Sequence, residues 1–428
     1  MKRNFMNLKL NFDLKSILAL YINMYPREFK PFINHSIMSA KISYTVMKKI
    51  NPHENFVDIF LISMLHDVGF LIREAITNYS DFYSDLSERW DMDMLMKKFD
   101  ATNEHAGISS AVMKYLGVED ELKLKAIEMH HEYEMGCISG GGIFGDVLRL
   151  SDFIAGNYSR HYSPENSDEF MEYLISEIRK EESYHPLVKE CIEDSICNLS
   201  DYNFMFSEKI NFPDIPEIEQ KVLDINLAQK YIKLISFILD IRSPFTRNHS
   251  SQVAAISSKI CEELLGTCDS QIAYISGLLH DIGKIKVPLK ILHKKGKLNK
   301  YEFFIMQKHV VDTYVLLNKN GFSVIDKICG AHHERLDGSG YPHNLKGDEM
   351  LFIAKSIQVA DVFSALIEDR PYREKMSYSK AISIIEEDVK RKKLDAISFE
   401  KLKMLIKNGY EFNGYKNIMK TFFGEKLI

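Results

Sequence analysis

Histidine and aspartate recur in the same order in the two halves of the chain. In each half, a histidine precedes a His-Asp pair by 31 residues, and another histidine, a His-His pair and an aspartate follow. Ten of the 15 histidines belong to this pattern, so we expect two copies of one unit. The members are His35, His66, Asp67, His105, His130, His131 and Asp152 in the first copy, and His249, His280, Asp281, His309, His332, His333 and Asp361 in the second.

Helical periodicity predominates along the chain. Strand-like alternation between turns is scarce, so the sequence predicts an all-α fold of two tandem helical bundles. Apolar residues recur at helical spacing, or form apolar runs suited to a buried helix, in residues 35–50, 57–65, 222–241, 272–279 and 378–391.

Two prolines in a polar stretch, residues 211–216, predict a break between the copies. We therefore expect four segments. They are an N-terminal domain at 1–205, a linker at 206–222, a second domain at 223–390 and a C-terminal helical appendage at 391–428.

Composition narrows the class of protein. A chain of 428 residues with 45% hydrophobic residues is neither collagen-like nor wholly disordered. A formal net charge of −5 without a dominant basic block argues against binding of long nucleic acids. No apolar run approaches the roughly 20 residues of a membrane span, and we see no signal peptide. The six cysteines include no CxxC pair and are expected to be reduced, so we expect a cytoplasmic protein.

The repeated residue types suit metal ions. Imidazoles and carboxylates bind divalent Fe, Mn or Zn, and the absence of cysteine from the pattern argues against a structural zinc site. Five histidines and two aspartates exceed the needs of one ion with open positions, so two ions sharing a bridging carboxylate fit better. Such a pair can hold a bridging hydroxide for in-line displacement at phosphorus. We predict Asp281 as the bridging carboxylate.

The second copy adds residues suited to a phosphate substrate. Lys284 lies one turn after His280, where a cation can stabilise charge on a transferring phosphoryl group. Arg370 and Arg373 offer fork-shaped donors for phosphate. Tyr341 lies in a Gly-Ser-Gly-Tyr-Pro turn, from which its ring can stack on a nucleobase.

The second copy also resembles a known family. His-Asp-Ile-Gly-Lys at 280–284, followed by His-His-Glu-Arg-Leu-Asp-Gly-Ser-Gly-Tyr-Pro at 332–342, closely resembles the HD-GYP branch of the HD phosphohydrolase superfamily. Ala-Asp-Val-Phe at 360–363 and Asp-Arg-Pro-Tyr-Arg at 369–373 continue the match. The resemblance implies an all-α domain with two or three Fe or Mn ions. It also implies hydrolysis of a cyclic dinucleotide, chiefly cyclic di-GMP, to a linear dinucleotide and often to GMP.

The resemblance implies roles for individual residues. The seven second-copy members of the pattern bind the metal ions, and Asp281 and Lys284 act in catalysis. The first copy resembles a plain HD domain that keeps all seven ligand positions, so a further metal site is predicted there. It lacks the GYP turn and has Phe70 near the position of Lys284, which indicates a regulatory site or a different substrate. The implied substrate contacts are Lys284, Arg335, Asp337, Tyr341, Arg370 and Arg373.

The sequence departs from the family pattern at some positions and leaves alternatives open. Phe245 lies near the place of a glutamate found in trinuclear members, which favours two metal ions. Ser364 replaces the last residue of the usual Asp-Val-Phe-Asp, so substrate or metal preference can differ. The alternatives are a 3′,3′-cyclic GMP-AMP phosphodiesterase, an HD nucleotidase or dNTP hydrolase, and a cyclic-dinucleotide receptor without turnover. A homodimer is left open as the assembly.

Overall fold

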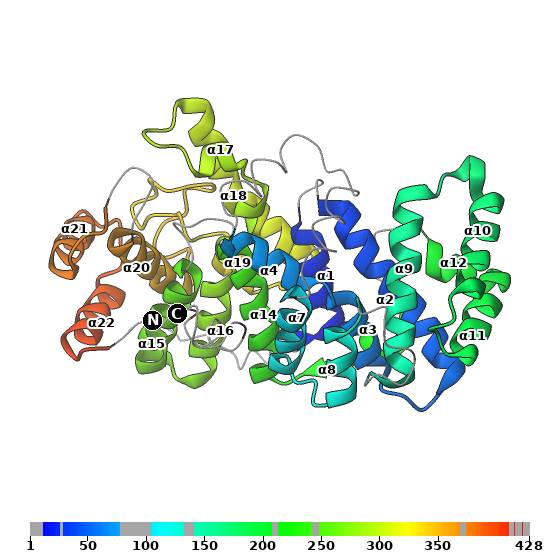
Figure 1. Cartoon of the computed structure of the whole chain (residues 1–428). Coiled ribbons are helices and arrows are strands. Elements are labelled where there is room, and N and C mark those ends of the chain that lie inside the picture. Colours follow the sequence, from blue (N-terminus) through cyan, green and yellow to red (C-terminus); the bar gives the residue numbers. More distant parts are fainter. Residues whose placement is uncertain are drawn as a thin grey trace. The chain divides into compact units, whose positions relative to one another are not determined.

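The structure is a computed structural model, and almost all of its regular structure is helical (Figure 1). Within the described part, the strands are β1 (Phe12–Asp13) and β2 (Val222–Leu223), an antiparallel pair. The predicted all-α fold is confirmed, and no helix among the described residues is long and apolar enough to cross a membrane. The described residues are 12–25, 29–77, 104–131, 141–207, 213–241, 248–368 and 374–410, with Tyr415 and Phe422.

The chain folds into two compact units. The N-terminal unit contains α2 (Lys30–Ile50), α3 (Phe56–Leu65), α4 (Val68–Thr77), α7 (Glu104–Tyr115), α8 (Glu121–Glu128), α9 (Gly142–His161), the 3-10 helix η2 (Pro164–Asn166), α10 (Ser167–Lys180), α11 (Pro186–Cys197), α12 (Leu199–Phe206) and α13 (Pro216–Glu219). The C-terminal unit contains β1, α1 (Leu14–Met24), β2, α14 (Ile225–Asp240), α15 (His249–Leu265), α16 (Thr267–Leu279), η3 (Ile282–Lys286), α17 (Leu289–Leu292), α18 (Lys300–Lys319), α19 (Ile325–Cys329), α20 (Phe352–Ile367), α21 (Tyr378–Lys390) and α22 (Ala396–Lys407).

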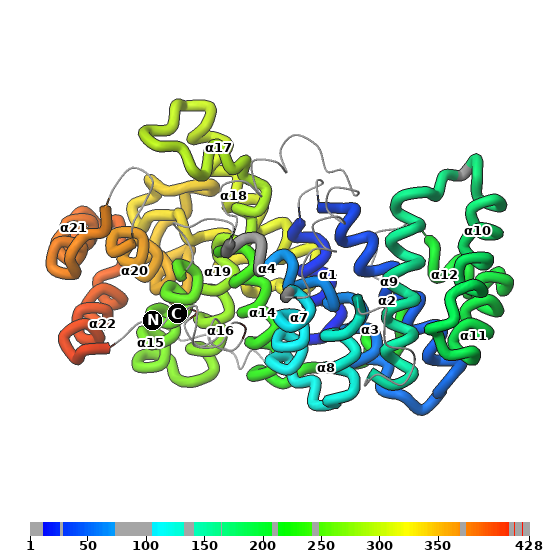
Figure 2. The backbone as a smooth tube through the Cα atoms, viewed as in Figure 1, coloured from blue at the N-terminus to red at the C-terminus, as the bar shows by residue number. Residues whose placement is uncertain are grey.

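Helices that carry the repeated pattern pair in the same way in each unit. In the N-terminal unit α2 contacts α3 and α9, and in the C-terminal unit α15 contacts α16 and α20. After the His-Asp pair, α4 packs on α7 in one unit and η3 packs on α18 in the other. Figure 2 traces both sets along the backbone. The two copies therefore share a helix arrangement as well as a residue order.

Local sequence explains where the helices of the site begin and end. The Asp224 carboxylate accepts two backbone N–H groups at the start of α14, and Asn299 and Glu302 form a capping box at the start of α18. The apolar helices α3 and α16 end at His66 and His280 respectively. Each His-Asp pair consequently lies at a helix end, as predicted for the second copy.

A glycine two residues after each aspartate lets the chain pass very close to the next helix. A Cβ atom added to Gly283 would lie 2.1 Å from the carbonyl oxygen of His309. A Cβ atom added to Gly69 would lie 2.1 Å from the carbonyl oxygen of His105. Only glycine fits this approach, which draws the third histidine of each copy towards the aspartate.

The predicted domain limits remain predictions, but three contacts show how the segments near those limits pack. The helix α1 packs on α14 and α18 of the C-terminal unit although it precedes α2 in the chain. Within the predicted linker, α13 packs on α3. Within the predicted appendage, Phe399 and Leu402 of α22 belong to the hydrophobic core formed with α15, α20 and α21.

Candidate metal centres

Asp281 lies at the middle of a cluster of imidazoles in the C-terminal unit. Its Oδ2 atom is 3.2 Å from His280 Nε2 and 3.7 Å from His249 Nε2. Its Oδ1 atom is 3.2 Å from His309 Nε2 and 3.6 Å from His332 Nε2. The two oxygens of one carboxylate therefore face two different pairs of histidines, which is the arrangement expected of a bridging ligand.

The two remaining predicted ligands complete this cluster from other elements. Asp361, on α20, places Oδ1 at 3.1 Å from His249 Nε2 and 4.0 Å from His280 Nε2. His333 groups with His309 and His332, with their ligand atoms within 4.8 Å of one another. The structure thus brings together all seven residues that the second copy of the pattern predicted.

The N-terminal unit contains the same arrangement around Asp67. Its Oδ2 atom is 3.2 Å from His66 Nε2 and 3.6 Å from His35 Nε2. Its Oδ1 atom is 3.3 Å from His130 Nε2 and 3.5 Å from His105 Nε2. Asp67 therefore stands between two histidine pairs as Asp281 does.

Asp152 and His131 complete the N-terminal cluster. The Oδ1 atom of Asp152 lies 2.8 Å from His35 Nε2 and 3.3 Å from His66 Nε2, so it corresponds to Asp361. His131 Nε2 lies 3.2 Å from His105 Nε2. All seven residues predicted for the first copy also come together.

Several atoms in these clusters are buried without a hydrogen bond. They include Asp281 Oδ1 and His280 Nε2 in one unit, and Asp67 Oδ1 and His130 Nε2 in the other. Asp67 Oδ1 and His130 Nε2 face each other at 3.3 Å. Buried polar atoms rarely lack partners. A cation bound between these nitrogen and oxygen atoms would accept their lone pairs and so supply the missing partner. The residues present therefore fit divalent metal ions.

Backbone carbonyl groups orient the imidazoles. In His66, His280, His309 and His332 the Nδ1 atom lies 2.6–2.8 Å from the carbonyl oxygen three residues earlier. A proton on Nδ1 makes that hydrogen bond and leaves the Nε2 lone pair directed at the aspartates. This arrangement is typical of metal-binding histidine.

Ionisation in the C-terminal cluster also suits a metal site. Burial lowers the pKa of His332 to about 3 and holds the pKa of His333 well below its usual range. Burial opposes ionisation of Asp281, but Lys284 and His280 hold the pKa of its carboxyl well below its usual range. Near neutral pH the ring nitrogens of His332 and His333 are thus free to act as ligands, and the carboxylate is charged.

Lys284 distinguishes the two units. Its Nζ atom contacts Asp281 Oδ2, and 18% of its side chain is exposed. The residue at the corresponding position of the N-terminal unit, three after Asp67, is the buried Phe70. One unit therefore has an accessible cation beside its central carboxylate, and the other has an apolar ring there.

The Gly-Tyr-Pro turn lies against the C-terminal cluster. The ring of Tyr341 stacks on that of His333, with centroids 4.9 Å apart and planes at 28°. The fully buried Glu334 accepts the backbone N–H groups of His343 and Leu345 at 2.7 and 3.0 Å. Glu334 thus holds the turn in place through these two hydrogen bonds, and Tyr341 borders the predicted metal ligand His333.

The other predicted substrate contacts have different surroundings. The Asp337 carboxylate accepts the N–H and Oγ–H of Ser339, so it caps its own turn. Arg335 Nη1 donates to the carbonyl oxygen of the preceding residue at 3.2 Å. Arg370 and Arg373 lie outside the described residues.

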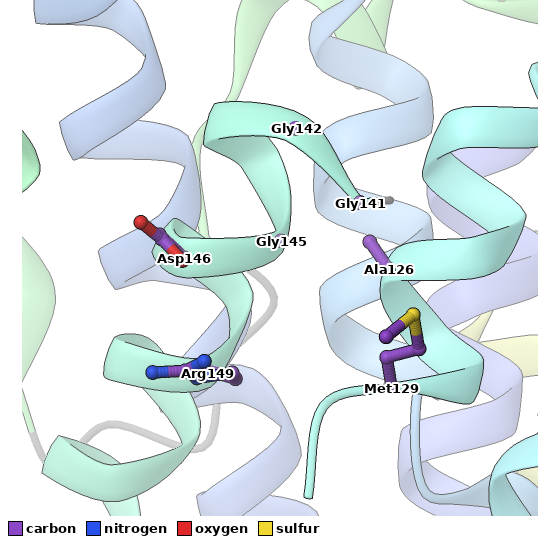
Figure 3. Close-up of a pocket in the computed structure, with 7 residues that line it drawn as sticks. All are labelled: Ala126, Met129, Gly141, Gly142, Gly145, Asp146 and Arg149. Atoms are coloured by element: carbon purple, nitrogen blue, oxygen red, sulfur yellow. The ribbon is translucent and has the colours of Figure 1, made fainter. Parts of the chain in front are cut away.

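Glycines occupy the place of this turn in the N-terminal unit. Gly141 and Gly142 begin α9 beside α8, and a Cβ atom on Gly141 would lie 3.0 Å from Ala126 Cα. Figure 3 shows the cavity here, whose volume of about 20 Å³ is room for about one water molecule. Among the described residues of this segment, the cavity has no room for a nucleotide.

A carboxylate behind His249 was missed from the sequence. Glu368 Oε2 lies 3.0 Å from His249 Nδ1, where it orients the ring as the carbonyl groups do for other ligands. The sequence could have indicated Glu368 by its position seven residues after Asp361, because that spacing places it two helical turns further along the same face. Ser159 takes the corresponding place after Asp152 in the N-terminal unit.

The region that contains the C-terminal cluster is similar to known proteins. A family model described as HD domain matches residues 233–397. The chain is 39% identical over 204 residues to the 3′3′-cGAMP-specific phosphodiesterase 1 of Vibrio cholerae serotype O1, covering 47% of this chain and 46% of the relative. It is 34% identical over 160 residues to a cyclic di-GMP phosphodiesterase of Thermotoga maritima, covering 36% and 43%. The chain thus spans less than half the length of these curated relatives.

A solved structure extends the comparison to the fold of the whole chain. The crystal structure of a cyclic GMP-AMP-specific phosphodiesterase from V. cholerae covers 93% of this chain and 98% of its own, with a TM-score of 0.55 and 21% identity. This likeness supports the helical fold, and an N-terminal HD domain remains a prediction. Residues 233–397, which hold the His-Asp cluster and the Gly-Tyr-Pro turn of the C-terminal unit, match the HD domain family.

Proposed function

We propose that the C-terminal unit is a metal-dependent phosphodiesterase that hydrolyses a 3′–5′ phosphodiester bond of a cyclic dinucleotide. The observation that carries this proposal is the position of Asp281 between two histidine pairs, with Lys284 beside it. The names of the V. cholerae and T. maritima relatives supply the substrate class.

The ligand set is proposed to hold two divalent ions, with Fe or Mn as the expected metals. His249, His280 and Asp361 would face one ion. His309, His332 and His333 would face the second ion, and Asp281 would hold one ion with each of its two oxygens. Bound there, such ions activate water and neutralise charge on phosphate oxygens.

Side chains of this unit then act on the phosphate. Lys284 lies where its ammonium can stabilise negative charge that develops on the phosphoryl oxygens. Water adds to phosphorus, the bond to the 3′ oxygen breaks, and that oxygen takes a proton. The product is a linear dinucleotide with a 5′-phosphate. Tyr341 is proposed to border the base, and Arg370 and Arg373 to bind phosphate.

A direct comparison of substrates tests this function. Reduced full-length protein loaded with Mn or Fe is incubated separately with cyclic di-GMP and with 3′,3′-cyclic GMP-AMP, and the products are separated by chromatography. We expect cleavage of one or both to a linear dinucleotide, and the initial rates rank the substrates. Binding of either compound without cleavage by metal-loaded protein would contradict hydrolysis and favour a receptor.

Lys284→Met is expected to slow hydrolysis about 100-fold at saturating substrate, because it removes a cation that acts on the transition state. Metal content, measured by inductively coupled plasma mass spectrometry, should stay at the wild-type level. The matched control is Lys286→Met, which removes an exposed lysine from the same 3-10 helix. Equal rates for the two variants would show that Lys284 has no part in the reaction.

The N-terminal unit is proposed to bind metal without hydrolysing the cyclic dinucleotide. Its seven ligands adopt the same arrangement, but the buried Phe70 stands where hydrolysis would need Lys284. We propose a regulatory role, or a different substrate, for this second centre. The cytoplasmic location and the homodimer remain predictions.

A further inference from the structure

We propose that the N-terminal unit binds a small organic anion with a flat apolar body, in a cavity between α2, α9 and α12. The cavity has a volume of about 380 Å³, within the range of small-molecule sites. This proposal does not rest on the proposed hydrolysis. The lining residues are Pro31, Asn34, Ile37, Met38, Lys41, Tyr158, Ser159, Tyr162, Met205, Phe206 and Ser207.

The cation of this cavity is Lys41. Its side chain is buried, and its Nζ atom donates to Ser207 Oγ at 2.7 Å and to the Ser207 carbonyl oxygen at 3.3 Å. Both acceptors are neutral, and no carboxylate in the described part of the chain lies within ion-pair distance of it. The residues lining the cavity likewise include no acid. Burial lowers the pKa of Lys41 to about 8.

A buried ammonium group without a counter-ion costs free energy, and an anion in the cavity would recover part of that cost. Because the described lining residues include one cation and no acid, the cavity favours a singly charged anion over a neutral or cationic molecule. Ser159 lies where the C-terminal unit has Glu368, so this cavity also lacks the carboxylate of that position.

Aromatic rings define the shape of the ligand. The rings of Tyr158 and Tyr162 stack with centroids 4.1 Å apart and planes at 14°. Tyr158 also stacks on Phe206, at 5.1 Å and 23°. Met38 and Met205, two adaptable apolar side chains, line the same space. A flat aromatic body is the shape that packs on such a surface.

The cavity shares its helices with the N-terminal metal cluster. The helix α2 carries both His35 and Lys41, and α9 carries both Asp152 and Ser159. These helices contact each other directly. An anion bound at Lys41 therefore contacts the same two helices that position His35 and Asp152.

Two fluorescent probes that differ by one charge test the proposal on the full-length protein. The anion is 1-anilinonaphthalene-8-sulfonate, and its neutral counterpart without the sulfonate is N-phenyl-1-naphthylamine. We expect saturable binding of the sulfonate and weaker binding of the neutral probe. Lys41→Met should weaken the sulfonate about tenfold, equivalent to about 1.4 kcal/mol, and leave the neutral probe unchanged. Lys41→Arg should keep the preference for the sulfonate.

The matched control is Lys233→Met, which removes a partly buried lysine from α14 of the other unit and should change neither probe. A second variant, Met38→Trp, fills the cavity while keeping Lys41 and should weaken both probes. Circular dichroism melting verifies that each variant is folded. Equal affinity for the two probes in the wild type, or unchanged sulfonate binding in folded Lys41→Met or Met38→Trp, would overturn the proposal. If Lys41→Met is unfolded, loss of the preference in Lys41→Arg would overturn it.

Discussion

Asp281→Asn is expected to lower cyclic-dinucleotide hydrolysis by about 1000-fold, since it removes the charge that would hold both ions. An amide has one acceptor oxygen, and its NH₂ group would face one of the histidine pairs. Initial rates on the substrate preferred by the wild type measure the effect. Metal content per chain, measured on the same samples, should fall as well.

Asp67→Asn is the matched change in the N-terminal unit, because Asp67 is surrounded as Asp281 is. We expect it to lower metal content per chain and to spare most of the turnover. The opposite result, with turnover lost in Asp67→Asn and kept in Asp281→Asn, would move the reaction to the N-terminal unit. Retained turnover in both would place it at neither centre.

Gly283→Ala is expected to destabilise the C-terminal unit by about 3 kcal/mol, at the upper end for overpacking. The new methyl group would lie 2.1 Å from the His309 carbonyl oxygen and 2.6 Å from the Thr313 backbone nitrogen. Neither backbone atom can move without displacing α18, which carries His309. We therefore expect a lower Tm in calorimetry together with loss of metal from the C-terminal centre.

Gly107→Ala supplies the control, because a Cβ atom added there meets nothing within 4 Å. Alanine also favours the helix α7 that contains Gly107, so stability should stay level or rise slightly. Gly69→Ala, which meets the His105 carbonyl oxygen at 2.1 Å, should instead resemble Gly283→Ala. A Tm for Gly283→Ala equal to that of Gly107→Ala would refute the close approach.

The repeated order of histidine and aspartate was enough to predict the composition of both clusters. Metal ligands must converge whatever helices carry them, so residue type and order alone identified Asp281 as central. Helical periodicity likewise located α2, α3, α14, α16 and α21. The helices could be predicted because they depend on the local pattern of apolar residues. The clusters could be predicted because few residue types can bind a metal ion.

Contacts between neutral groups, or between residues far apart in the sequence, could not be predicted from the sequence. The N–H of Gly283 donates to Thr313 Oγ1 and that of Gly69 to Ser109 Oγ, both at 2.9 Å. A hydroxyl residue four positions after a histidine is too common to indicate such a bond. Glu368 was missed because an acid at a helix end is usually solvated.

The antiparallel pair β1–β2 has a topological consequence. Because β1 and α1 belong to the C-terminal unit, residues 27–221 of the N-terminal unit are inserted within it, and Phe422 also belongs to the N-terminal unit, where its ring contacts Tyr115. A fragment that starts at Val222 would lack α1 and uncover the surfaces of α14 and α18 on which α1 packs. To keep α1 in an isolated C-terminal unit, residues 27–221 would have to be excised and the chain rejoined. During synthesis, α1 cannot pack on α14 and α18 until residues 27–221 and these two helices have been made.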